Sequence, residues 1–341
     1  MTNFPSAIIP KPVLKLLKSP ALSRHQKRYI KSDYKGILHP DWRLDLRLDE
    51  HVLAYTACNS HPETKRIAKR MKRCRLDRRC GVLLCFFCRF LHAHELNAKI
   101  QSAFRSIPTK RIRFETVLIR AIHGTPAEIT RQMQVIIKDF RKANRLLAAN
   151  HAIASAGTPL IKFGSIDLDV YRCADVAQLW SERSSDKRKA VKVRLFKKLG
   201  RKDYWSDYFV VVHSHAVMAA RSFKKYKKAI CRKMPGKRRV VAKRLFKIKP
   251  VPDSLRYLSG YISKVAGRYG PLTGSSKLLL DHTPMRDLMI ALEPFSFRSL
   301  KLHIGTSRSA HRDLQNQISI ADHQPGPSTP SPQRNHPYLT L

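Results

Sequence analysis

The sequence predicts an α+β protein in which a sheet with flanking helices is preceded by a cysteine-rich, zinc-binding segment. Three observations support this prediction. Residues 208–218 are a run of β-branched and aromatic residues, which is typical of a buried strand. Residues 129–147 carry apolar side chains at three- and four-residue steps, as one face of a helix does. Five of the seven cysteines lie within residues 58 to 88, which indicates metal ligands in a reducing compartment rather than disulfides.

The composition favours a polyanionic partner. The 341 residues include 67 Lys and Arg against 24 Asp and Glu, which gives a formal charge of +43. Cations that neutralise phosphates release counterions, so a nucleic acid is the expected partner. A ribosome-associated or merely solvated basic protein would have the same composition. No stretch approaches about 20 consecutive apolar residues, and the first residues lack the pattern of a signal peptide. We therefore expect a cytoplasmic protein without a membrane span.

We divide the chain into four parts. Residues 1–45 are basic and punctuated by prolines, which predicts a flexible arm that contacts phosphates or is simply solvated. Residues 46–105 form the cysteine-rich segment, and residues 106–300 form the domain that contains the sheet. Residues 301–341 become rich in Pro and Ser, which predicts a disordered tail.

The cysteine cluster contains a Cys-x-x-Cys knuckle surrounded by Lys and Arg. Structural Zn²⁺ takes four soft ligands in a tetrahedron, and nearby cations favour the thiolate form that binds metal. The predicted zinc ligands are Cys74, Cys80, Cys85 and Cys88. Cys58 or His92 is a possible substitute for one of them. Buried cysteines without a metal are the alternative interpretation.

Two elements are expected between the cysteines and the histidines. Residues 112–119 alternate as a strand does, and a helix begins at Thr125, where Glu128 completes a capping box. A second strand is expected over residues 164–171. There Asp167 and Asp169 share one face of the strand. These two aspartates either contribute to a functional site or simply face solvent at the edge of the sheet.

Two histidines and two tyrosines carry the most specific signal. His213 and His215 lie two residues apart on a strand and therefore share a face, which makes half of a divalent-metal site. Tyr257, Tyr261 and Lys264 form one stripe of a helix. Core packing would explain that stripe equally well, although Leu258, Ile262 and Val265 offer a separate apolar face. Between these elements, residues 221–249 are basic with interleaved aromatic residues, as in a nucleic-acid-binding wall or a solvated basic helix.

The paired-histidine strand followed by Tyr-x-x-x-Tyr-x-x-Lys resembles the HUH endonucleases, the rolling-circle replication initiators and their relatives. The run from Cys80 to Cys88 and the Phe114-x-Thr116 motif are similar to segments of plasmid initiators, where the latter is structural or substrate-positioning. Two residues depart from the pattern: Phe86 replaces a frequent Pro, and Ser214 replaces a bulky hydrophobic residue. The resemblance covers about residues 58 to 270.

The resemblance implies a fold, a metal site and a reaction. A four- or five-stranded antiparallel sheet would hold His213, His215 and Asp169 around Mg²⁺ or Mn²⁺, with Asp167 as the alternative to Asp169. Tyr261 would be the nucleophile, leaving a 5′-phosphotyrosine bond and a free 3′-hydroxyl. Tyr257 would act as the second nucleophile of a two-tyrosine enzyme. Lys264 would stabilise the phosphate charge or lower the pKa of the tyrosine.

The expected function is therefore initiation of rolling-circle replication of a plasmid or phage. The expected partners are single-stranded DNA, origin DNA, and a host helicase and polymerase. A host helicase is expected because the chain has no ATP-binding Gly-x-x-x-x-Gly-Lys-[Ser/Thr] loop of its own. No small-molecule cofactor is expected. A transposase or relaxase would use the same chemistry, and a non-catalytic, zinc-containing nucleic-acid-binding regulator is the alternative outside the enzymes.

Overall fold

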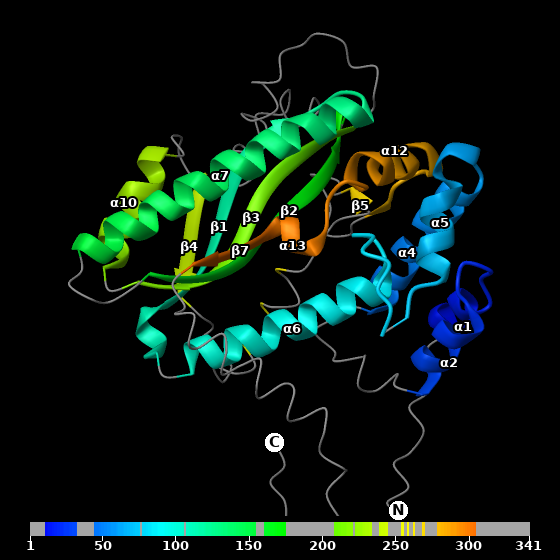
Figure 1. Cartoon of the computed structure of the whole chain (residues 1–341), viewed down its shortest axis with the longest axis horizontal. Coiled ribbons are helices and arrows are strands. Elements are labelled where there is room, and N and C mark those ends of the chain that lie inside the picture. The colour runs from blue at the N-terminus through cyan, green and yellow to red at the C-terminus, as the bar shows by residue number, and fades with distance from the viewer. Residues whose placement is uncertain are drawn as a thin grey trace, which may run out of the picture. The chain divides into compact units, whose positions relative to one another are not determined.

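An antiparallel sheet, crossed by one long helix, dominates the computed structural model of the chain (Figure 1). The structure describes residues 11–32, 44–75, 77–105, 107–154, 160–174, 208–220, 222–233, 239–244, 254, 255, 258, 262, 268, 269 and 278–304. All of these belong to one unit that spans residues 1–305, and residues 306–341 form a second unit outside the described residues.

Seven strands build the sheet within the described residues, in the order β4-β1-β3-β2-β5-β6, with β7 also paired to β2. The histidine strand β3 is central, between β1 and β2, and both pairings are antiparallel. Only a single β2–β5 pair is parallel among the described pairings. The strands are β1 (Ile112–Ile122), β2 (Ile161–Arg172), β3 (Tyr208–Ala219), β4 (Val240–Arg244), β5 (Arg268–Tyr269), β6 (Leu278–Leu279) and β7 (Lys301–Ile304). The expected α+β class with an antiparallel sheet is confirmed, but the described part of the sheet has seven strands where four or five were expected.

Helix α7 (Pro126–Ala154) covers one face of the sheet, which we call the α7 face. Its start is the predicted capping box, because Thr125 N donates to Glu128 Oε2 at 2.8 Å and Glu128 N donates to Thr125 Oγ1 at 3.3 Å. Met133, Ile136 and Phe140 are buried in one cluster with residues of β2 and β3 that alternate toward this helix. Helix α10 (Phe223–Lys233) packs beside α7.

The opposite face, which we call the α6 face, is partly covered by helix α6 (Phe86–Phe104). Leu96, Ile100 and Phe104 of α6 share a second hydrophobic cluster with Phe163 of β2 and Val217 of β3. His213 and His215 alternate in phase with Val217, so they also lie on the α6 face.

Part of the expected flexible arm is folded. Residues 11–32 include α1 (Lys11–Leu17) and α2 (Arg24–Ser32), and Leu17, Leu22 and Ile30 are at most 5% exposed. The buried Gln26 side chain donates to the main-chain oxygens of Met71 and Cys74 at 3.0 Å each. These tertiary contacts are the reason that this basic stretch is ordered, and its sparse apolar residues did not predict them.

The remaining described helices are shorter than α6 and α7. They are α4 (Leu44–Asn59), η2 (Pro62–Thr64), α5 (Lys65–Lys72), η3 (Thr109–Arg111), α12 (His282–Leu292) and α13 (Phe297–Leu300). None of the helices in the described ranges is long and apolar enough to cross a membrane. The predicted disordered tail starts too early at residue 301, because residues 301–304 are strand β7, whose backbone pairs with β2.

Candidate metal centres

Strand register brings a carboxylate to the two histidines. Asp167 of β2 stands directly opposite His213 of β3. Side chains of opposite residues in an antiparallel pair project from the same face. The ligand atoms of Asp167, His213 and His215 all lie within 4.8 Å of one another, so this group could hold a metal ion. The three residues are at most 5% exposed.

Both imidazoles are oriented through their Nδ1 atoms. His213 Nδ1 lies 3.3 Å from the main-chain oxygen of Val211, and His215 Nδ1 lies 2.9 Å from Thr116 Oγ1. The ring of Phe114 stacks on that of His215, with centroids 5.5 Å apart and planes 11° apart. Histidines that bind metals commonly use one ring nitrogen for the metal and the other for such a hydrogen bond. In this arrangement, Nε2 of each ring is the nitrogen that could bind a metal.

The structure favours Asp167 over Asp169 as the third ligand, although the sequence made Asp169 the first choice. Asp167 Oδ2 lies 3.5 Å from His213 Nε2, whereas Asp169 Oδ2 lies 3.9 Å from it and accepts a hydrogen bond from Tyr171. Asp167 Oδ1 accepts from the main-chain nitrogen of Leu168 at 2.8 Å, which fixes the carboxylate. The Asp169 side chain is 21% exposed and lies on the same sheet face.

The two carboxylates act on the protonation of His213. Burial lowers the pKa of His213, but the negative charges of Asp169 and Asp167 outweigh burial, and the net pKa is raised. The two carboxylates therefore favour positive charge beside the His213 ring. A divalent cation would satisfy the same two carboxylates.

Tyr257, Tyr261 and Lys264 lie outside the described residues. Their helical neighbours Leu255, Leu258 and Ile262 are described, and each is at most 3% exposed. These three leucine and isoleucine side chains belong to the cluster on the α6 face that contains Phe163 and Val217. Leu258 and Ile262 of the expected apolar face are thus buried, in the cluster that α6 forms with this face of the sheet. The third residue of that face, Val265, lies outside the described residues.

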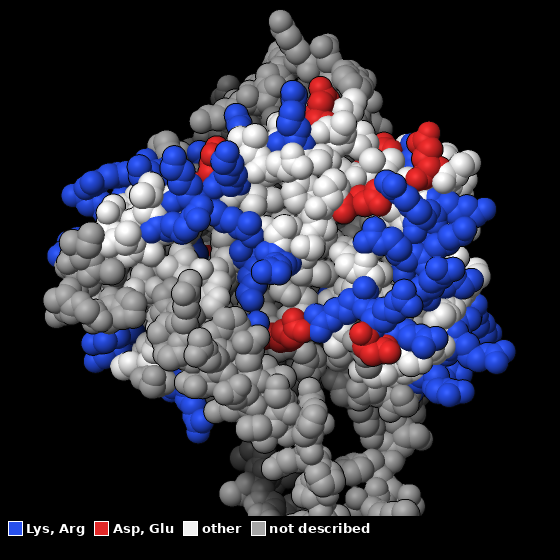
Figure 2. Space-filling model, viewed as in Figure 1, with Lys and Arg blue, Asp and Glu red and all other residues white. Residues whose placement is uncertain are grey.

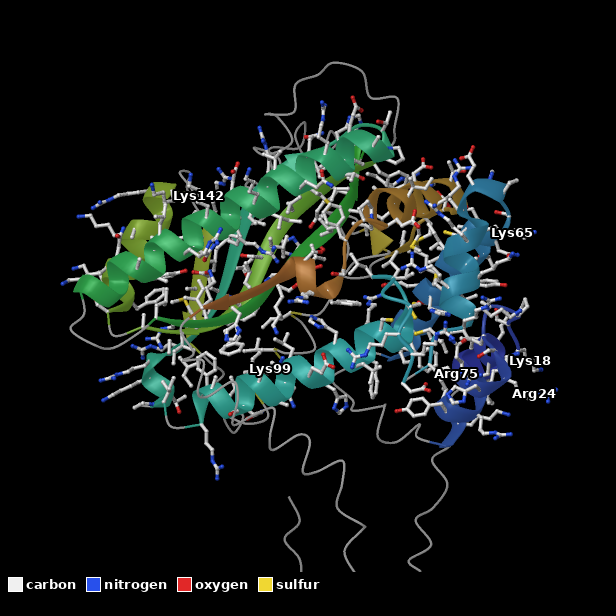
Figure 3. All side chains as sticks on the ribbon, viewed as in Figure 1. Lys18, Arg24, Lys65, Arg75, Lys99 and Lys142 are labelled. Carbon is white, nitrogen blue, oxygen red and sulfur yellow. The ribbon has the colours of Figure 1, made fainter. Side chains whose placement is uncertain are left out.

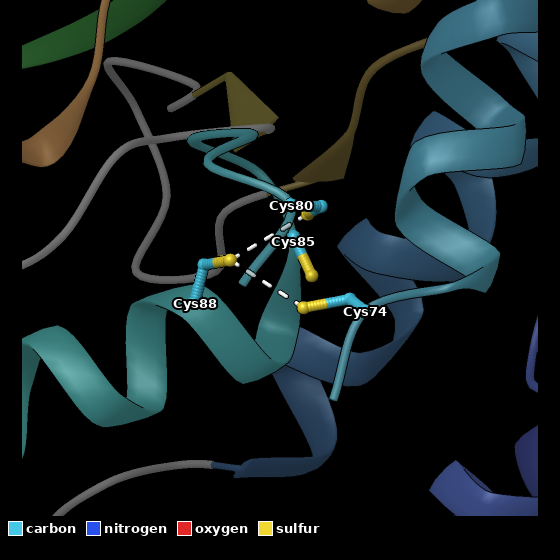
Figure 4. Close-up of side chains that lie close together, drawn as sticks. All are labelled: Cys74, Cys80, Cys85 and Cys88. Atoms are coloured by element: carbon cyan, nitrogen blue, oxygen red, sulfur yellow. Dashed lines mark hydrogen bonds between the residues drawn. The ribbon is translucent and has the colours of Figure 1, made fainter. Parts of the chain in front are cut away.

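The four predicted zinc ligands converge from three short segments (Figure 4). Their sulfur atoms lie within 4.8 Å of one another, and Cys88 Sγ lies 3.5 Å from Cys74 Sγ and from Cys80 Sγ. A tetrahedral zinc with bonds of about 2.3 Å needs sulfur atoms about 3.8 Å apart. The cluster is therefore compatible with a structural zinc site.

The local backbone explains this convergence. Cys74 follows the end of α5, and Cys85 and Cys88 lie at the N-cap and in the first turn of α6. Gly81, next to Cys80, has φ +75°, a value that L side chains rarely adopt. Hydrogen bonds from the thiols of Cys74, Cys80 and Cys85 lower the pKa of Cys88. The N-terminus of a helix stabilises a thiolate, and the thiolate is the form of cysteine that binds a metal cation.

The two possible substitutes lie outside this cluster. Burial raises the pKa of Cys58 to about 12, as expected of a structural thiol. His92 stacks on Phe297, with ring centroids 4.6 Å apart. Neither residue belongs to the group of four cysteines.

The expected nucleic-acid wall is described in part, as α10 and β4. Tyr226 and Ile230 are buried, and the lysines between them face solvent, so one face of α10 packs as expected. Tyr226 also joins a buried network that the sequence did not indicate. Its hydroxyl donates to Glu115 at 2.7 Å, and the ammonium of Lys162 contacts Glu115 and Asn144.

Ser214 projects onto the α7 face and is fully buried. The departure from the family pattern at this position therefore affects packing and not the metal group.

Comparisons of the chain with models of protein families, with curated proteins and with solved structures found no match. The chemistry of the two candidate metal centres therefore carries the argument on function.

Proposed function

We propose that this chain is an HUH-type endonuclease that nicks single-stranded origin DNA and initiates rolling-circle replication. One observation carries the proposal: Asp167, His213 and His215 converge from adjacent antiparallel strands on the α6 face. The helical residues Leu258 and Ile262, which flank Tyr261 in the sequence, pack on that same face. This relationship supports a helix on the α6 face, and we place Tyr261 on that helix.

The donor set suits Mg²⁺ or Mn²⁺. One carboxylate and two imidazoles make a mixed oxygen and nitrogen site, and each histidine has its Nδ1 atom engaged elsewhere. The ion would supply Lewis-acid polarisation of the scissile phosphate. Asp167, His213 and His215 would hold it, and Thr116 and Phe114 would keep the His215 ring in place.

The chain's own residues supply the covalent step. The Tyr261 hydroxyl loses its proton and attacks phosphorus, so that its oxygen becomes bonded to the 5′ end of the cut strand. The 3′ oxygen leaves, takes up a proton and becomes the primer for a host polymerase. Lys264 stabilises the negative charge on the phosphate, and Tyr257 performs a second strand transfer that releases a circle.

The four-cysteine cluster has a structural role in this proposal. Four sulfur ligands leave no open position for a substrate, which is the arrangement of structural zinc. A bound Zn²⁺ would connect the end of α5 to the start of α6, and α6 in turn packs on the sheet face that carries the histidines.

The decisive experiment is cleavage of a labelled, single-stranded origin hairpin in Mg²⁺ or Mn²⁺, read on a denaturing gel. Wild-type protein should nick and form a covalent adduct. Tyr261→Phe should lose both products, because Phe keeps the ring and removes the nucleophile. Tyr257→Phe should still nick but release fewer circles.

The control outcomes separate the alternatives. An adduct in the Tyr257→Phe, Tyr261→Phe double mutant would place the nucleophile elsewhere. Salt-sensitive binding without any nicking by the wild-type protein would favour a zinc-containing nucleic-acid-binding regulator. A transposase or relaxase would nick in the same way, and the genetic location of the cleaved site distinguishes these from a replication initiator.

A further inference from the structure

Two helices beside the cysteine cluster each present a regular stripe of cations. On α5, Lys65, Lys69 and Lys72 follow one another at positions i, i+4 and i+7, and all three are exposed. The other side of α5 is fixed, because Ile67 and Met71 are at most 1% exposed. The lysine stripe is therefore held on a rigid helix.

Helix α2 repeats this arrangement. Arg24, Arg28 and Lys31 also stand at i, i+4 and i+7 and are exposed, while Gln26 and Ile30 are fully buried. The Gln26 side chain donates to the main-chain oxygens of Met71 and Cys74, so α2 is bound to the end of α5 and to a zinc ligand. Figure 2 shows Lys and Arg gathered on the right of the view, where Figure 3 labels Lys18, Arg24, Lys65 and Arg75, and a second group on the left.

We call the surface formed by these two stripes the α2–α5 surface; its six side chains are Arg24, Arg28, Lys31, Lys65, Lys69 and Lys72. Their charges are not neutralised within the described part of the chain. Arg66 and Arg70 on another side of α5 pair with Glu293, and Arg79 pairs with Glu95. None of the six stripe residues has a carboxylate within ion-pair distance among the described residues. Between residues 65 and 79, the sequence has nine Lys and Arg and a single acidic residue, Asp77.

We propose that the α2–α5 surface binds the sugar–phosphate backbone of double-stranded DNA. Each stripe is about 10 Å long, and a duplex carries about six negative charges over that length. Binding of a single strand would favour exposed aromatic side chains, on which separated bases stack. Among the residues whose burial the structure describes, no Phe, Tyr or Trp is exposed. Tyr29 of α2 is instead half-buried against Phe87.

The choice of DNA over RNA rests on the proposed function, since an origin is a duplex before it is nicked. The α2–α5 surface would hold the duplex origin while the histidine face acts on the single strand. Cations supply affinity and orientation but little sequence information, so this surface should bind duplexes of unrelated sequence.

The test compares two sets of substitutions with the same spacing. Lys65→Gln, Lys69→Gln and Lys72→Gln remove the α5 stripe. Lys138→Gln, Lys142→Gln and Arg145→Gln remove an equal charge at the same i, i+4, i+7 spacing on the exposed side of α7. Zinc content and thermal unfolding show whether each variant is folded.

Fluorescence anisotropy with a labelled duplex of about 25 base pairs, measured over a range of KCl concentrations without Mg²⁺, gives the affinity and its salt dependence. The α5 variant should bind duplex about tenfold more weakly, and its salt slope should fall by about one for each phosphate that it no longer neutralises. The α7 variant should differ from wild type by less than about threefold. Arg24→Gln, Arg28→Gln and Lys31→Gln should reproduce the α5 result.

Equal weakening by the α5 and α7 variants would mean that only total charge matters, and the proposal would be overturned. It would also be overturned if the α5 variant lost affinity for a single strand but not for the duplex. Competition by a polyglutamate peptide as effective as that by duplex would indicate an acidic protein partner instead. The assay contains no cleavage step, so its failure is independent of any failure to detect nicking.

Discussion

Thr116 Oγ1 lies 2.9 Å from Nδ1 of His215, across the β1–β3 pair in which these two residues stand directly opposite each other. This contact engages Nδ1, so Nε2 is the ring nitrogen that could bind a metal. Such outer partners of metal ligands commonly affect metal affinity about 10- to 100-fold.

The first prediction concerns this contact. Thr116→Val keeps the shape of the side chain and removes the hydrogen bond, so it should weaken Mn²⁺ binding about tenfold in calorimetric titration of the zinc-loaded protein. Thr116→Ser keeps the hydroxyl and should stay within about threefold of wild type. Equal affinities of the Val and Ser variants would show that the hydroxyl does not position His215. Nitrogen chemical shifts of the His215 ring give a second, independent measurement.

A second prediction distinguishes the two aspartates. Asp167→Asn should lower Mn²⁺ affinity at least about tenfold, because Asp167 stands opposite His213 with its Oδ2 atom 3.5 Å from Nε2. Asp169→Asn should have a smaller effect, since Asp169 is more distant and partly exposed. His213→Ala with His215→Ala should abolish Mn²⁺ binding while most of the salt-sensitive DNA binding remains. The reverse order of the two aspartate variants would make Asp169 the ligand.

A third prediction concerns zinc. Purified protein should contain about one equivalent of Zn²⁺, and Cys88→Ser should lose it, because Cys88 contacts two other ligands at 3.5 Å. Since metal binding contributes directly to folding free energy, the variant should also unfold at a lower temperature. Cys231→Ser removes a thiol outside the cluster and is the matched control. Retention of zinc by Cys88→Ser, or loss of zinc from Cys231→Ser, would contradict the assignment.

The fourth prediction is a pH dependence of stability. Burial lowers the pKa of His92 from 6.5 to about 4, so the folded protein holds this ring neutral while the unfolded chain protonates it. As the pH falls, His92 is therefore protonated first in the unfolded state. The contribution of His92 to the free energy of unfolding decreases from pH 6.5 to about pH 4. His92→Phe keeps a ring against Phe297 and removes the titration.

Between pH 7 and pH 5, wild type should lose about 2 kcal/mol more free energy of unfolding than His92→Phe. Urea denaturation at several pH values measures this difference. From pH 7 to pH 8, the two proteins should keep a constant difference in stability. Parallel curves from pH 8 down to pH 5 would mean that His92 is not held neutral by burial.

The sequence by itself determined the features that depend on local periodicity. Alternation along a strand placed His213 and His215 on one face, and cysteine spacing selected the four sulfur atoms that converge. Thr125 and Glu128 specified the start of α7 through a capping box of adjacent residues. In each case the interacting groups are close in the chain, so the local backbone brings them together.

Only the tertiary structure decided features that depend on how distant segments pair. Asp167 and Asp169 are equivalent in strand alternation, and the β2–β3 register alone puts Asp167 opposite His213. The contact of Thr116 with His215 joins residues 99 positions apart. Likewise, the order of α2 depends on Gln26 reaching Met71 and Cys74. Register and packing result from burial summed over the whole core, and no single stretch of sequence contains that information.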